Sequence, residues 1–145
     1  MSGEFKMRLI DYEPTADNFL EEVLEGLRKP QKTLPSKFIY DERGSEIFSR
    51  ICELDEYYPT RTEIAIMRES ADEMAGVIGP ECAIVEYGIG SALKTRILLE
   101  TLDDPVACVP VDISREFLLN SSEGLAREFP RIEFVTVCAN FMAPF

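Results

Sequence analysis

A glycine-containing loop points most directly to ligand binding. Residues 85–95 read Val-Glu-Tyr-Gly-Ile-Gly-Ser-Ala-Leu-Lys-Thr and begin at the end of an apolar run. Glycines there let the backbone turn tightly and approach a ligand closely. Glu86, two residues before Gly88, completes the acidic-x-Gly-x-Gly pattern with which S-adenosylmethionine sites begin. The segment after the loop carries Lys94, whose cation could pair with a ligand carboxylate.

Two further positions agree with a nucleoside ligand. Asp112 ends the next apolar run, 22 residues after Gly90, where an acidic side chain can accept hydrogen bonds from both hydroxyls of a ribose. Asn140 and Phe141 follow the third apolar run, where an amide and a ring could contact an adenine. Each feature alone could be a tight turn, a solvated charge or a core ring. Their joint spacing indicates an adenosine-containing ligand.

The loop also narrows the type of adenosine ligand. The dinucleotide fingerprint requires a third glycine, but Leu93 stands at that position. A nucleotide-phosphate loop of the form G-x-x-x-x-G-K-[ST] does not occur. An amino-acid tail suits this loop better than a pyrophosphate. The predicted cofactor is therefore S-adenosylmethionine, and an NAD-type oxidoreductase is a less favoured alternative.

The elements that position these residues alternate along the second part of the chain. Apolar runs predict strands at 82–85, 106–111 and 132–137, the first of them buried on both faces. Helical spacing predicts helices between them, at 93–102 and from Ser114 to a stop at Pro130. Pro110 lacks an N–H group and suggests that the hydrogen-bonded ladder of the strand at 106–111 ends there. The order β-α-β-α-β predicts a parallel sheet with helices on both faces.

The first 80 residues have the pattern of helices and loops. An apolar stripe over 19–27 predicts a helix with Asp17 as N-cap, and a short helix over 47–52 is expected with Ser45 as its cap. Pro59 predicts a loop over 55–59. The spacing of Thr60 and Glu63 matches a capping box that opens a helix ending at Gly79.

Composition excludes several functions. The net charge of −12 leaves no basic patch for nucleic acid. No apolar run reaches the roughly 18–20 residues of a membrane span. With four cysteines far apart and no histidine, no metal site and no Ser-His or Cys-His catalytic pair is expected. The cysteines fit reduced thiols, and we expect a cytoplasmic protein.

Several blocks of the sequence resemble the histidine Nα-methyltransferase family of ergothioneine biosynthesis, which uses S-adenosylmethionine. The similarity covers roughly residues 15–142 in matching order. Its most specific part is the block Tyr-Tyr-Pro-Thr-Arg-Thr-Glu. The blocks that carry the resemblance are residues 34–41, Gly44-Ser45 with Phe48, 56–63, 86–91, 94–96 and 110–112.

The resemblance implies binding roles for six residues. It implies no residue that acts as a catalytic acid, base or nucleophile. Gly88 and Lys94 would contact the methionine part of the cofactor, and Asp112 would bind its ribose. Asn140 and Phe141 would contact the adenine, although the family usually has an acid where this chain has Asn140. Tyr57 would hydrogen-bond the side chain of a histidine-like amino-acid substrate. Catalysis of methyl transfer would then depend mostly on positioning and desolvation.

The resemblance also implies that the family fold is incomplete here. Family members are about twice as long, and their second half completes the sheet and most of the substrate pocket. We therefore expect an α/β fold in which an N-terminal helical region (residues 1–80) precedes a truncated Rossmann-like methyltransferase βαβαβ unit (81–145). The open edge of strand 82–85 predicts self-association. The alternative to an N-methyltransferase fragment with little activity is a non-catalytic cofactor-binding or assembly module.

Overall fold

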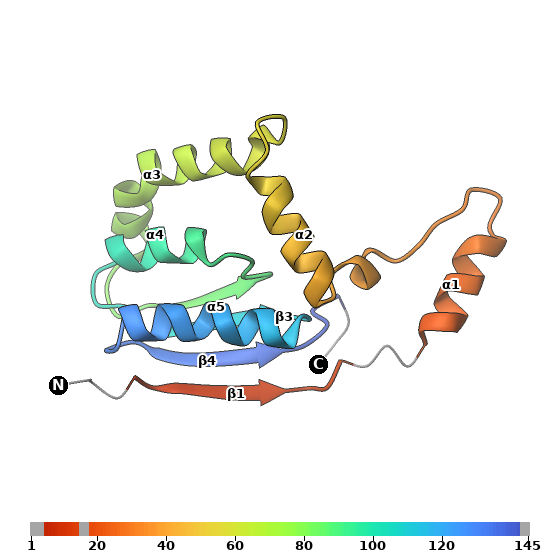
Figure 1. Ribbon diagram of the computed structural model, residues 1–145. Helices are drawn as coiled ribbons and strands as arrows, with labels where there is room; N and C mark the ends of the chain where they lie inside the picture. The colour runs from red at the N-terminus through yellow and green to blue at the C-terminus, as the bar shows by residue number, and fades with distance from the viewer. Residues whose placement is uncertain (1–4, 15–17, 143–145) are drawn as a thin grey trace.

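The computed structural model describes residues 5–14 and 18–142. Strands and helices alternate over the second half of the chain, as the apolar runs predict (Figure 1). In chain order the elements are β1 (Met7–Asp11), α1 (Phe19–Arg28), the short 3-10 helix η1 (Ser36–Ile39), α2 (Glu42–Cys52), α3 (Tyr58–Ile78), β2 (Ala83–Tyr87), α4 (Leu93–Thr101), β3 (Ala107–Asp112), α5 (Arg115–Glu128) and β4 (Glu133–Cys138).

The strands form one parallel sheet in the order β1-β4-β3-β2. Strands β2, β3 and β4 confirm the predicted βαβαβ unit. Strand β1 was not expected from the sequence, and it lies within the region expected to hold only helices and loops. It pairs with β4 from Met7 opposite Phe134 to Asp11 opposite Cys138. Arg115 of α5 holds its end through a 2.7 Å ion pair to Asp11.

Both crossover helices lie on the same face of the sheet, so the expectation of helices on both faces is wrong. The core on that face joins Leu99 of α4 and Leu118 of α5 to Cys108 and Phe134 of the strands. Helices α2 and α3 continue this layer, since α2 packs on α5 and α3 on α4 (Figure 1). The strand order explains the arrangement. The chain moves in one direction from β2 to β4, and right-handed crossovers then place both helices on one face.

Strand β2 is the last strand of the described sheet, which confirms the expected open edge. The expectation that this strand is buried on both faces is wrong. Its side chains alternate between exposed and half-buried positions, and Val85 is 53% exposed. Strand β3 continues through Pro110 to Asp112, so the ladder does not end at the proline. Its pairing with β4 skips Val109 and Pro110 instead.

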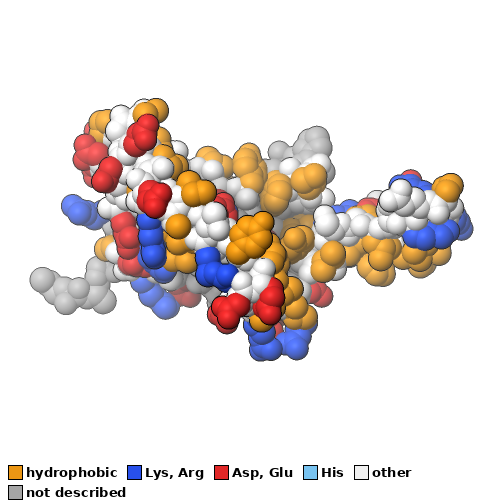
Figure 2. Space-filling view, turned by 90° about the horizontal axis from the view of Figure 1, so that it is seen from above, with side chains coloured by type: hydrophobic (Ala, Val, Ile, Leu, Met, Phe, Trp, Pro, Cys, Tyr) orange, Lys and Arg blue, Asp and Glu red, His pale blue; other side chains and the backbone are white. Residues whose placement is uncertain are grey.

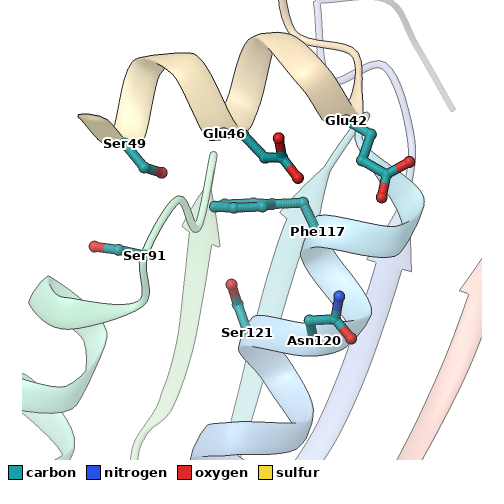
Figure 3. A pocket seen from close by; sticks show the side chains of 7 residues that line it. All are labelled: Glu42, Glu46, Ser49, Ser91, Phe117, Asn120 and Ser121. Atoms are coloured by element: carbon teal, nitrogen blue, oxygen red, sulfur yellow. The ribbon is translucent and has the colours of Figure 1, made fainter. Parts of the chain in front are cut away.

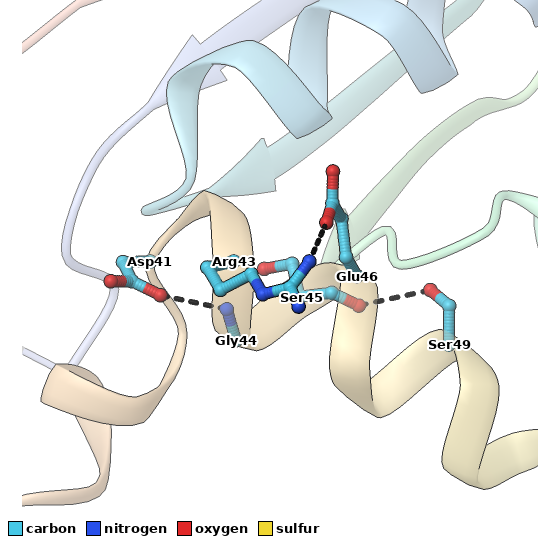
Figure 4. A network of polar contacts seen from close by, with 6 residues as sticks. All are labelled: Asp41, Arg43, Gly44, Ser45, Glu46 and Ser49. Carbon is cyan, nitrogen blue, oxygen red and sulfur yellow. Dashed lines mark hydrogen bonds and ion pairs between the residues drawn. The ribbon is translucent and has the colours of Figure 1, made fainter.

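Helix α2 starts five residues earlier than predicted, because its cap is Asp41 and not Ser45. The Asp41 carboxylate accepts the backbone N–H of Gly44 at 2.7 Å, and Arg43 pairs with Glu46 one turn on (Figure 4). A Cβ at Gly44 would lie 1.6 Å from the carbonyl oxygen of Ile39. Only glycine fits this close approach.

Helix α3 begins at Tyr58 and includes Pro59 in its first turn, so residues 58 and 59 are not loop. Proline is favoured there because the first turn of a helix does not use its missing N–H group. Arg61 fixes the start by donating from Nη1 and Nη2 to the carbonyls of Leu54 and Asp55, at 2.7 and 2.6 Å. Thr60 is therefore a helical residue and not the predicted cap.

Helix α1 and η1 form an arm that extends from the body (Figure 1). Phe19 packs edge-to-face on Phe38 at 4.8 Å, and Lys37 pairs with Glu22 at 2.7 Å. The predicted cap Asp17 lies outside the described residues. Figure 2 shows apolar side chains along this arm, and Leu20 is 69% exposed. None of the helices over the described ranges combines the length and apolar character that crossing a membrane requires.

Candidate functional site

The glycine loop starts where β2 ends, at the carboxyl edge of the parallel sheet. Gly88 and Gly90 have φ angles of 78° and 53°, in the left-handed region where glycine is favoured. The N–H of Gly88 donates to the carbonyl of Val111 at 2.7 Å, which fixes the loop against β3. Helix α4 follows directly at Leu93. The loop therefore lies between two strand ends and a helix start, where ligands bind in such sheets.

Asp112 ends β3 beside this loop. Its carboxylate accepts the N–H of Ser114 at 2.9 Å. Burial is the largest influence on this carboxyl and raises its pKa, while the nearby backbone N–H groups of Ser114, Ile113 and Gly90 lower it. Gly90 and Asp112 are 22 residues apart in the sequence, and the Gly90 backbone lies close enough to Asp112 to influence its pKa.

Phe141 brings the end of β4 to the same place. Its ring lies 5.5 Å from the ring of Tyr87, the last residue of β2. A Cβ built at Gly88 would lie 4.0 Å from the Phe141 ring, so the ring contacts the glycine loop. The side-chain oxygen of Asn140 accepts the N–H of Met142 at 3.1 Å, which leaves that oxygen one lone pair for another donor.

Lys94 and Glu86 carry the charge of the site. The Lys94 ammonium lies 3.2 Å from the carboxylate of Glu63, which comes from α3. Glu86 is half-buried and accepts a hydrogen bond from the hydroxyl of Thr95. Burial raises the pKa of Glu86 to about 7; Lys94 lowers it, and the charges of Glu63 and Asp112 raise it. The loop is therefore a site with one ammonium group among three carboxyl groups.

Tyr57 lies away from the strand ends, immediately before α3. Its ring packs edge-to-face on Phe48 of α2 at 6.0 Å, and Phe48 packs in the same way on Tyr40 at 6.1 Å. The structure connects this aromatic cluster to the glycine loop through the first turns of α3, where Glu63 reaches Lys94. Five of the six predicted residues thus meet around the sheet edge, whereas Tyr57 belongs to the helical region.

A pocket lined by other residues than the predicted site lies on the helix side of the glycine loop, between α2 and α5 (Figure 3). Ser91 of the loop borders it, and the Phe117 ring lies beneath the carboxylate of Glu46. Ser121 joins the pocket to the loop by donating to the carbonyl of Gly90 at 2.9 Å. None of the six predicted residues lines this pocket. Its lining residues are Glu42, Glu46, Ser49, Ser91, Phe117, Asn120 and Ser121.

Sequence reasoning missed Glu63 and Thr95 as members of the site. Glu63 was assigned to a capping box, an interpretation that fails because α3 starts at Tyr58. Its ion pair with Lys94 spans 31 residues, and no local spacing reveals such a contact. Thr95 could have been found from the sequence, because it lies one residue after Lys94 at the start of the expected helix. In the structure its hydroxyl donates to Glu86.

A parallel sheet with a glycine loop after one strand, an acid after the next and an aromatic residue after the third defines a Rossmann-like cofactor-binding domain. The model of the family described as "Histidine-specific methyltransferase, SAM-dependent" matches residues 19–144. The chain belongs to this family of S-adenosylmethionine-dependent enzymes, which confirms the resemblance found in the sequence.

Individual relatives agree with the family assignment. The chain is 36% identical over 129 residues to a histidine N-alpha-methyltransferase of Mycolicibacterium smegmatis, covering 87% of this chain and 40% of the relative. It is 38% identical over 123 residues to the protein of the same name from Mycobacterium tuberculosis, covering 83% and 38%. Ergothioneine biosynthesis protein 1 of Neurospora crassa is 41% identical over 90 residues, which are 60% of this chain and 10% of that protein. The chain thus spans about two fifths of the bacterial relatives.

Proposed function

We propose that this chain is the cofactor-binding part of an S-adenosylmethionine-dependent N-methyltransferase that acts on the α-amino group of histidine or a related amino acid. The observation that carries the proposal is the meeting of Gly88, Asp112 and Phe141 at the carboxyl ends of β2, β3 and β4. A strand-end site of this kind suits an adenosine ligand. The names of the bacterial relatives support the substrate class.

The residues of the loop fit the parts of this cofactor. The half-buried Asp112 carboxyl would accept hydrogen bonds from the ribose hydroxyls, since its partial burial leaves it poorly solvated. Phe141 and the remaining lone pair of the Asn140 oxygen would contact the adenine. Lys94 would pair with the carboxylate of the methionine part, beside Gly88. When bound, the cofactor supplies an activated methyl group on its sulfonium.

The protein's own part in the reaction is to position the two ligands and exclude water. Tyr57 would hydrogen-bond the side chain of the amino acid from the helical region. The chain spans two fifths of its relatives, so we expect it to supply only part of that positioning. It should therefore bind the cofactor but methylate histidine slowly or not at all. A non-catalytic cofactor-binding module would also bind the cofactor but would never turn over.

Calorimetric titration tests the cofactor assignment directly. The chain should bind S-adenosylhomocysteine, the demethylated product form, and not NAD. Asp112→Asn should weaken this binding, because an amide is a poorer acceptor for two hydroxyl donors, while the matched change Asp72→Asn on the exposed surface of α3 should not. Binding of NAD alone would reverse the assignment to an oxidoreductase. Methylation of histidine as fast as by a full-length relative would refute the expected loss of positioning.

We also propose that the chain self-associates through the open edge of β2. This proposal is supported by the position of β2 as an edge strand of the described sheet and by the exposed side chain of Val85. Val85→Lys should shift the chain toward monomer in sedimentation velocity, whereas Val77→Lys, at an 83% exposed position of α3, should not. A strictly monomeric wild type at high concentration would count against this.

We also propose a cytoplasmic location for the chain. The four cysteines are free thiols, which supports this proposal.

A further inference from the structure

The ammonium of Lys94 is engaged by a carboxylate of the chain itself. Lys94 Nζ lies 3.2 Å from Glu63 Oε1, and the pair joins the start of α4 to the first two turns of α3. Both side chains are partly exposed, at 40% for Lys94 and 54% for Glu63. Exposed pairs of this kind are weak and exchange partners easily, because water screens them.

The surroundings of Lys94 are strongly acidic. Glu86 and Asp112 lie within electrostatic reach, since the charges of Lys94, Glu63 and Asp112 all act on the titration of Glu86. Around Glu86 there are therefore one cation, Lys94, and two further carboxyl groups, Glu63 and Asp112. A further carboxylate that enters this site meets net negative charge and finds the single ammonium already paired. Removing the charge of Glu63 would both release Lys94 and reduce the repulsion.

We propose that Glu63 is a positioning residue that competes with the cofactor: it holds the Lys94 ammonium beside the glycine loop and must release it when a ligand carboxylate binds. Glu63 thereby sets how strongly the site favours ligands whose amino-acid tail carries a carboxylate. This inference rests on the proposed function, because it takes an adenosyl ligand with an amino-acid tail as the occupant. It also links the helical region that holds Tyr57 to the cofactor loop.

Three adenosyl ligands that differ only in the tail test the inference by calorimetry. S-adenosylhomocysteine has both the ammonium and the carboxylate, its decarboxylated analogue has only the ammonium, and 5′-methylthioadenosine has neither. In Glu63→Gln, S-adenosylhomocysteine should bind about threefold to fivefold more tightly at low salt, the size of one exposed ion pair. The other two ligands should not bind more tightly. The matched control is Glu73→Gln, an exposed glutamate further along α3, which should change none of the three affinities.

Each other outcome has a definite meaning. If Glu63→Gln leaves the affinity for S-adenosylhomocysteine unchanged or weakens it, the competition is refuted while the proposed function stands. Equal tightening of all three ligands also refutes it, because the effect would not depend on the ligand carboxylate. A wild-type chain that binds none of the three ligands refutes the proposed function itself, and this inference with it.

Discussion

Replacing Glu86 by glutamine should change how the stability of the chain depends on pH. The pKa of Glu86 lies at about 7 in the folded chain, against an ordinary value of 4.5, and burial is the main cause. The folded state therefore binds a proton more tightly than the unfolded state. A carboxyl group with a raised folded pKa contributes stability that is fully present below its unfolded pKa and is lost as the pH rises through its folded pKa. For Glu86 this window runs from about pH 4.5 to about pH 7.

The size of the effect follows from these two values. Each pH unit between them corresponds to about 1.4 kcal/mol, so wild type should lose about 2 to 3 kcal/mol from this group between pH 5 and pH 8. Glu86→Gln keeps an oxygen that can accept from the Thr95 hydroxyl but does not ionise. The free energy of unfolding of the variant minus that of wild type should therefore rise by about this amount over the same range.

Urea denaturation followed by far-ultraviolet circular dichroism at pH 5, 6, 7 and 8 measures this difference. Subtracting the two proteins cancels every group that they share. Glu73→Gln serves as the control, because this glutamate lies exposed on α3, and its difference from wild type should stay flat. If the difference for Glu86→Gln is equally flat, Glu86 is ionised throughout this range and the account of a desolvated carboxyl is wrong.

Two further changes test how the helical region is held. Gly44→Ala should lower the free energy of unfolding by at least about 2 kcal/mol in urea denaturation, because the new Cβ would lie 1.6 Å from the Ile39 carbonyl oxygen. Gly76→Ala, where a Cβ meets nothing within 4 Å, should not destabilise the chain. Arg61→Ala removes two hydrogen bonds to the turn before α3, and amide hydrogen exchange at Tyr57 should become several times faster as a result. Exchange at Tyr57 that is unchanged would show that Arg61 does not hold this turn.

The central βαβαβ unit could be predicted because its signals are local. Continuous apolar runs marked β2, β3 and β4, and prolines or glycines marked where the elements stop. The meeting of Gly88, Asp112 and Phe141 followed from a general rule, since the carboxyl ends of neighbouring parallel strands share one edge. Which face of the sheet each helix covers could not be predicted from the sequence in this way. They depend on the strand order, which a local pattern does not contain.

The missed features depend on contacts between distant parts of the chain. Strand β1 has five residues, of which Arg8 and Asp11 are charged, and it pairs with a strand more than 120 residues later. Glu63 looked like a capping residue because Thr60 stands three positions before it, but α3 had already begun at Tyr58. Arg61 holds that earlier start through two backbone carbonyls. A side-chain bond to a carbonyl leaves no residue pattern in the sequence.

The open edge of the sheet and the cofactor loop belong to the same strand. Tyr87, at the end of β2, is 61% exposed and contacts Phe141, while the next residue, Gly88, begins the loop. A segment that pairs with β2 would therefore lie beside the adenine and ribose positions proposed here. We therefore expect assembly at this edge to be coupled to cofactor binding, and thermodynamic reciprocity then requires each to change the affinity of the other by the same factor. Sedimentation of the chain with and without S-adenosylhomocysteine measures that factor, and an identical association constant in both would show that the edge and the loop act independently.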